Sequence, residues 1–200
     1  KIIMKEPQKS NLIMKNKKVF IIQGFEGKPN GAWKSWLMVE LDRHDIYACS
    51  LAMPHSDAPI LSDWLDEVKR HVDMYPHDDI YLVGHSIGGV TILRYFEKYN
   101  NPNVKGVCLC ATRSEKLVDS KLPTFFDTDF DFTSIRKNIP TTVVIHGNDD
   151  PVVPTENAER TAKELEAKLV WVPNGKHLNG SAGIMELPEC LNALLEMIGV

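Results

Sequence analysis

Three side chains along this 200-residue sequence could together carry out nucleophilic chemistry: Ser86, Asp150 and His177. A serine hydroxyl is a weak nucleophile at neutral pH, so it needs a base within hydrogen-bond reach and a third group that orients this base. An imidazole, whose ordinary pKa lies near ~6.5, can accept the serine proton at pH 7. The chain order serine, acid, histidine is typical of a nucleophile placed on a turn between a strand and a helix.

The string Gly-His-Ser-Ile-Gly-Gly places the serine on such a turn. It follows the apolar run Ile80–Val83 and precedes a helix-like segment, Gly88–Tyr99. Strand and helix nearly touch at a sharp turn, so a Cβ at Gly84 or Gly88 would collide with neighbouring backbone. Alone, Gly-x-Ser-x-Gly occurs often by chance. Its place directly after a strand makes Ser86 the expected nucleophile.

The acid and the base are expected in two later loops, each just past the end of a strand. The first reads HGNDDPVVP and offers Asp149 and Asp150, whose side chains must point in different directions because they are adjacent in a turn. We prefer Asp150, because Pro151 fixes the backbone after it and leads into the next helix. Asp149 stays the alternative. The second loop reads VPNGKHLNG and contains His177, the expected base.

A tetrahedral intermediate also needs two backbone N–H donors for its oxyanion. One comes from the residue after the serine and one from the loop after the first strand, which indicates Ile87 and Phe25. Trp33, Phe125 and Phe126 are candidate residues of a substrate pocket.

The segment that contains two of these rings, residues 113–132, is irregular and rich in phenylalanine and acids. Its rings either line a pocket or plug the edge of the core, and the sequence does not separate these two interpretations. His85, next to the serine, is expected to support the turn.

Strand-like and helix-like segments alternate through the chain. Near-continuous apolar strands joined by helices predict a parallel sheet with helices on both faces, in which ligands bind beyond the carboxyl ends of the strands. The expected strands are the run from Val19, then Ile46–Ala52, Ile80–Gly84, Val104–Ala111, Thr141–His146 and Lys168–Val172. The expected helices lie within Ala32–His44, Ile60–Met74, Gly88–Tyr99, Glu156–Glu166 and Leu187–Ile198.

Composition indicates one ordinary globular domain and excludes several classes. The chain is 43% hydrophobic and 25% charged, with a formal net charge of −4 and no basic stripe for a nucleic acid. No apolar run approaches the roughly 20 residues of a membrane span. We expect a loosely ordered lead-in at residues 1–18 and a single domain at residues 19–200.

The cysteines and short motifs give no sign of a cofactor. Cys49, Cys108, Cys110 and Cys190 show no zinc-site spacing, and neither a dinucleotide nor a nucleotide fingerprint is present. The first three lie in apolar strand-like runs and are expected to be buried thiols, which favours a cytoplasmic location. We therefore expect no metal and no cofactor.

These motifs resemble the α/β-hydrolase superfamily and, within it, the small serine hydrolases typified by retinoblastoma-binding protein nine and its bacterial relatives. The resemblance rests on GHSIGG, on Trp33 and Trp36, on HGNDDPVVP and on KHLNGSAGIMELPE. It implies catalytic Ser86, Asp150 and His177, a three-layer α/β/α sandwich with a six-stranded, mostly parallel sheet in the order 2-1-3-4-5-6, and no large cap domain. The Leu-x-Cys-x-Glu string associated with retinoblastoma-protein binding is absent, so no protein partner is carried over.

The resulting functional hypothesis is a carboxylesterase-like serine hydrolase that cleaves small esters, or amides, through an acyl-enzyme. Two alternatives use the same residues. One is a hydrolase-shaped binding protein with little turnover, and the other is an acyltransferase or perhydrolase that transfers the acyl group to an acceptor other than water.

Overall fold

Six short strands form one sheet, and all five pairings between neighbours are parallel, in the order β2-β1-β3-β4-β5-β6. The structure is a computed structural model that describes residues 16–118 and 120–200. Both the expected sheet and its strand order are confirmed. The strands are β1 Lys17–Ile22, β2 Tyr47–Ser50, β3 Asp79–His85, β4 Val104–Cys110, β5 Thr141–Gly147 and β6 Lys168–Val172.

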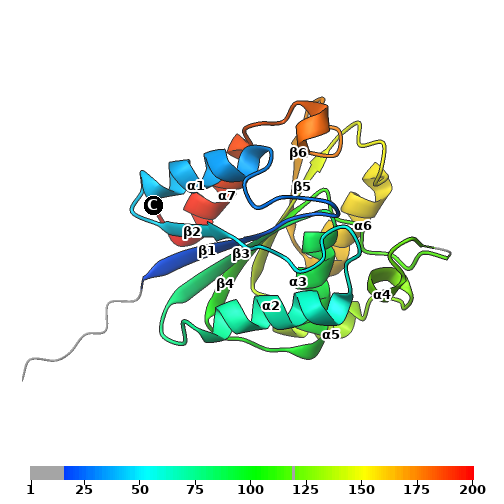
Figure 1. Cartoon of the computed structure of the whole chain (residues 1–200), viewed down its shortest axis with the longest axis horizontal. Helices are drawn as coiled ribbons and strands as arrows, with labels where there is room; N and C mark the ends of the chain where they lie inside the picture. The colour runs from blue at the N-terminus through cyan, green and yellow to red at the C-terminus, as the bar shows by residue number, and fades with distance from the viewer. Residues whose placement is uncertain (1–15, 119) are drawn as a thin grey trace, which may run out of the picture.

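Helices cover both faces of this sheet, which confirms the three-layer sandwich. Figure 1 shows α1 and α7 on one side of the sheet and α2, α3 and α5 on the other. The long helices are α1 Trp33–Asp42, α2 Leu61–Asp73, α3 Ile87–Lys98, α6 Thr155–Leu165 and α7 Pro188–Ile198. Shorter ones are α4 Pro123–Phe126, α5 Phe132–Asn138 and the 3₁₀ turn η1 Gly180–Ala182.

Two hydrophobic cores follow from the two-residue period of a strand. Along β1, Val19 and Ile21 pack in the core beneath α1 and α7, whereas Phe20 and Ile22 pack in the core beneath the other helices. A strand buried on both faces needs apolar residues at successive positions, which is why these strands read as continuous apolar runs.

The ends of the chain and the longest connection complete the fold. Strand β1 begins at Lys17, two residues earlier than expected, and residues 1–15 of the expected lead-in lie outside the described residues. The longest connection joins β4 to β5 and holds only α4 and α5. Within the described residues there is thus no large cap domain, and the carboxyl edge of the sheet is covered by loops.

Candidate active site

Ser86 occupies the turn between β3 and α3 in a strained backbone conformation. Its φ is 53° and its ψ is −120°, a region that costs on the order of 1–3 kcal/mol for a residue with a Cβ. The turn is held by the Ser86 N–H, which donates to the Cys110 carbonyl at 2.9 Å, and by the Ser86 carbonyl, which accepts from Gly89 at 3.0 Å. Ser86 lines a cavity at the carboxyl edge of the sheet.

Close packing around the turn requires the glycines that the sequence shows there. A Cβ at Gly84 would lie 2.5 Å from the Cα of Gly89, and one at Gly88 would overlap the carbonyl oxygens of Ile22 and Gln23 at the end of β1. The expected crowding at Gly84 and Gly88 is therefore present. It brings the loop after β1 against the serine.

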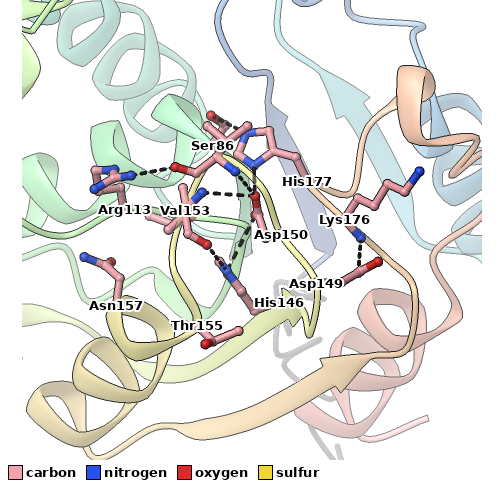
Figure 2. Close-up of polar contacts among 12 residues, drawn as sticks. Ser86, Arg113, His146, Asp149, Asp150, Val153, Thr155, Asn157, Lys176 and His177 are labelled. Atoms are coloured by element: carbon pink, nitrogen blue, oxygen red, sulfur yellow. Dashed lines mark hydrogen bonds and ion pairs between the residues drawn. The ribbon is translucent and has the colours of Figure 1, made fainter.

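Ser86, His177 and Asp150 are joined by an unbroken chain of hydrogen bonds (Figure 2). The Nε2 atom of His177 lies 3.1 Å from the Ser86 Oγ, and its Nδ1 lies 2.9 Å from Oδ2 and 3.2 Å from Oδ1 of Asp150. A carboxylate beside Nδ1 favours the tautomer with its proton on Nδ1, so Nε2 is left to accept the serine proton.

The Asp150 carboxylate is buried and kept ionised. Its side chain has no exposed surface, and its Oδ1 accepts the N–H groups of Val152 at 2.8 Å and Val153 at 3.0 Å. Burial raises its pKa, but the hydrogen bonds from His177 and from these two amides outweigh burial, and the pKa lies below its usual value. The carboxylate can therefore orient the imidazole as a permanent negative charge.

The neighbouring Asp149 is exposed in the turn and contacts a different group from Asp150. Its Oδ1 accepts the Lys176 N–H at 2.8 Å, and the Asn148 side chain likewise accepts the Asn174 N–H at 3.0 Å. Asp149 is thus a turn residue and not the partner of the His177 ring, which contacts Asp150. It ties the acid loop to the backbone next to His177 (Figure 2).

Two buried, neutral histidines brace the same loops. The Nε2–H of His85 donates to the His177 carbonyl at 2.8 Å, and burial, with a smaller effect from His177, lowers the His85 pKa to about 3. The Nε2–H of His146 donates to the Val153 carbonyl at 3.0 Å, and burial lowers its pKa as well. His85 was expected to support the serine turn; its hydrogen bond supports the His177 loop instead.

The two expected oxyanion donors border the cavity beside the serine. Phe25 and Ile87 both line it, and neither amide donates a hydrogen bond to any described residue. The loop after β1 lies close to the nucleophile, since a Cβ at Gly24 would lie 3.1 Å from the Ser86 Cβ. The Phe25 side chain is 41% exposed, so its ring forms a wall at the cavity mouth.

The cavity has a volume of about 720 Å³, and only one of the three predicted pocket residues lines it. Phe126 does so. Phe125 is fully buried, with its ring against Trp64 at 5.6 Å between centroids. Trp33 is also fully buried, and its Nε1–H donates to the Leu178 carbonyl at 2.8 Å. The predictions that Trp33 and Phe125 line the pocket disagree with these positions.

Residues 113–132 therefore combine the two interpretations that the sequence left open. Phe125 plugs the core, whereas Phe126, Leu117 and Leu122 face the cavity. The helix α4, which carries both phenylalanines, makes them point in different directions.

Arg94 of α3 holds this segment in place. Its side chain is 4% exposed, and its guanidinium donates to the carbonyls of Phe125 at 3.2 Å, Thr128 at 2.8 Å and Asp129 at 3.1 Å. It also pairs with Glu97 at 2.8 Å. Three carbonyls and one carboxylate match the fixed fork of donors on a guanidinium.

Other kinds of site have no support in the part of the chain that the structure describes. No group of three or more His, Cys, Asp or Glu side chains there could hold a metal ion. The helices of residues 16–118 and 120–200 are all too short or too polar to cross a membrane. Cys108, Cys110 and Cys190 are buried free thiols, as expected for the first two, while Cys49 is only half-buried.

Comparison with known proteins agrees with the fold and with a hydrolase family. Residues 19–196 match the serine hydrolase family. YdeN of Bacillus subtilis (strain 168) is 30% identical over 180 residues, which cover 89% of this chain and 94% of YdeN. The serine hydrolase RBBP9 of Rattus norvegicus is 25% identical over 171 residues, covering 83% of this chain and 86% of RBBP9.

Solved structures extend this likeness to three dimensions. The crystal structure of the B. subtilis ydeN gene product superposes with a TM-score of 0.84 at 29% identity, covering 92% of this chain and 100% of that one. Est1E from Butyrivibrio proteoclasticus shares the fold, with a TM-score of 0.73 at 19% identity over 93% of this chain and 90% of Est1E. Because the family match spans most of the chain and the YdeN fold follows it nearly end to end, this chain belongs to the serine hydrolase family.

Proposed function

We propose that this serine hydrolase cleaves small carboxylic esters through a covalent acyl-enzyme, with Ser86 as nucleophile, His177 as general base and Asp150 as the orienting carboxylate. The observation that carries the proposal is the hydrogen-bond chain from Asp150 through His177 to the Ser86 Oγ at the cavity wall. Membership of the family and the apolar lining around Phe126 support it.

The steps follow from the atoms that these residues present. His177 Nε2 takes the proton of Ser86 as Oγ bonds to the ester carbonyl carbon, and the amides of Phe25 and Ile87 receive the oxyanion. The tetrahedral intermediate collapses when His177 returns the proton to the alcohol oxygen and the carbon–oxygen bond breaks. Water then attacks the acyl-enzyme by the same route, giving its proton to His177, and the acid leaves as Ser86 regains a proton.

The decisive experiment is labelling with a fluorophosphonate probe, combined with turnover of 4-nitrophenyl acetate. Wild type should be labelled and should turn over the ester, and both properties should be lost in Ser86→Ala. Ser181→Ala is a matched control, because Ser181 lines the same cavity and bonds only to Asn179. Equal labelling of wild type and Ser86→Ala would refute the nucleophile.

The same assay separates the two alternative functions. A binding protein without turnover would hydrolyse the ester no faster than its His177→Ala variant. An acyltransferase or perhydrolase would divert product toward an added alcohol, amine or peroxide. A proposed cytoplasmic location rests on the free thiols, since such thiols persist in reducing compartments.

A further inference from the structure

The cavity beside Ser86 is positively charged in a chain whose formal net charge is −4. Its lining includes four basic side chains and one acidic side chain, an excess of three positive charges. The basic residues are Lys28, Lys34, Arg113 and Lys121, and the acidic one is Glu26. A concave site lined by one sign of charge attracts ligands of the opposite sign.

Among these cations, Lys34 stands out by its burial and its lack of a counterion. The residue is 5% exposed, yet its ammonium makes no hydrogen bond or ion pair with any described residue. Its one ring contact is with Trp33, at 5.8 Å from the centroid, near the outer limit of a cation–π interaction. By contrast, Arg113 pairs with Glu115 and donates to the Val152 carbonyl at 2.6 Å.

The position of Lys34 in its helix is also unfavourable for the stability of the fold. It is the second residue of α1, whose first turn contains no acidic residue and whose N-cap, Ala32, provides no side-chain cap. The N-terminus of a helix carries partial positive charge, so a cation there is destabilising. The side chain is also largely desolvated, with only its end open to the cavity, and this burial lowers the Lys34 pKa. No described side chain or carbonyl group offsets these two costs, whereas one bound anion would offset both.

The ammonium is also placed to meet a ligand. Lys34 lines the same cavity as Ser86, and the open side of Gly31 faces it, since a Cβ at Gly31 would lie 3.8 Å from Nζ. The start of α1 is fixed beside the serine turn, because the Trp33 ring lies edge-on to His85 at 6.1 Å.

We propose that Lys34 binds a carboxylate carried by the substrate, so that the preferred substrates are small esters bearing a carboxylate on the acyl or the alcohol half. This inference rests on the ester hydrolysis proposed above. A single unpaired ammonium that opens only to the cavity, beside a helix N-terminus, fits a monoanionic carboxylate, whereas a phosphate dianion calls for more donors.

The test compares charged esters with neutral isosteres. Monoethyl adipate is paired with ethyl 6-amino-6-oxohexanoate for the acyl half, and 4-acetoxybutanoate with 4-acetoxybutanamide for the alcohol half. Wild type should prefer the carboxylate in at least one pair by about tenfold to a hundredfold in kcat/KM, the range of a charge-assisted hydrogen bond. Lys34→Met should lose this preference through KM and keep its rate on the amide.

A control and a binding measurement keep the inference separate from the proposed function. Lys163→Met removes an exposed lysine of α6 and should retain the preference. Equal rates on both members of each pair, or an equal loss on both in Lys34→Met, would overturn the inference while ester hydrolysis stands. If no ester is cleaved, calorimetry still tests whether Lys34 binds the carboxylate. Monoethyl adipate or 4-acetoxybutanoate should bind to the Ser86→Ala variant and not to the Ser86→Ala/Lys34→Met double variant. Equal binding to both variants would refute the role of Lys34.

Discussion

The adjacent aspartates 149 and 150 allow one chemical change, carboxylate to amide, to be made at two neighbouring positions with opposite expected results. Asp150 contacts the His177 ring, whereas Asp149 contacts the Lys176 backbone N–H. Both substitutions keep the size of the side chain and remove one negative charge. A difference in activity therefore reports the contact and not the charge of the loop.

For Asp150→Asn the expected loss follows from donors and acceptors. The new amide oxygen can keep the N–H groups of Val152 and Val153, so the NH₂ group faces Nδ1 of His177. An NH₂ group only donates, so Nδ1 must accept and the ring proton moves to Nε2. That nitrogen can no longer take the serine proton. The same wrong tautomer in serine proteases lowers kcat by about 10⁴-fold, or about 5 kcal/mol, and we expect a loss of this order here.

For Asp149→Asn the amide oxygen still accepts the Lys176 N–H, which lies 2.8 Å away. We expect kcat/KM within about threefold of wild type, and a change in the free energy of unfolding within about 1 kcal/mol. The assay is turnover of 4-nitrophenyl acetate between pH 6 and 9, with urea unfolding to show that both variants fold. A 10⁴-fold loss in Asp149→Asn with an active Asp150→Asn would refute the assignment, and two active variants would refute the triad.

Two further predictions concern buried ionisable groups. Because the His85 pKa is about 3 in the folded chain and near ~6.5 when unfolded, the unfolded state binds more protons between these values, and stability is full only above pH 6.5. Between pH 6.5 and 3 this group alone should lower the free energy of unfolding by up to about 1.4 kcal/mol for each pH unit. His85→Gln should remove that part of the slope in urea titrations, and an unchanged slope would contradict it. Arg94→Met should cost about 3–5 kcal/mol in the same assay, because it leaves three backbone carbonyls without their donor and half-buried Glu97 without its cation. Arg70→Met breaks the more exposed pair with Glu67 and should cost less than about 1 kcal/mol. Similar losses of stability in Arg94→Met and Arg70→Met would show that Arg94 does not hold residues 113–132 in place.

The sheet and the nucleophile turn were predictable because their backbone geometry restricts which residue types can occupy each position. A strand buried on both faces must be apolar at successive positions, and a turn in which α3 meets β1 must have glycine at 88. The order of the strands depended on family resemblance, since apolar runs do not state which strand lies next to which. The acid and the base followed from chain order, and the choice of Asp150 over Asp149 from the proline behind it. Their catalytic roles stay predictions.

Side-chain direction was the part that the sequence could not provide. Trp33 has the same helical spacing whether it faces the core or the cavity, and Phe125 and Phe126 are identical neighbours of which only the second lines the cavity. Asp149 contacts a backbone N–H, and a backbone group has no signature in the sequence. Lys34 reads as a surface lysine of an amphipathic helix; only its burial without a partner distinguishes it.

Helix α3 couples the nucleophile to the wall of the cavity. It begins directly after Ser86 and contributes Val90 to the cavity lining. About two turns from the start of the helix, Arg94 binds the backbone carbonyls on either side of Phe126 and so fixes the position of that ring. Ser86 and Arg94 both lower the stability of the fold, because the Ser86 backbone is strained and the Arg94 charge is buried. Each residue is held in place by the packing of α3. Loosening α3 should therefore affect the position of the serine and the shape of the pocket together. For this reason we expect Arg94→Met to lower kcat as well as stability, although Arg94 does not line the cavity.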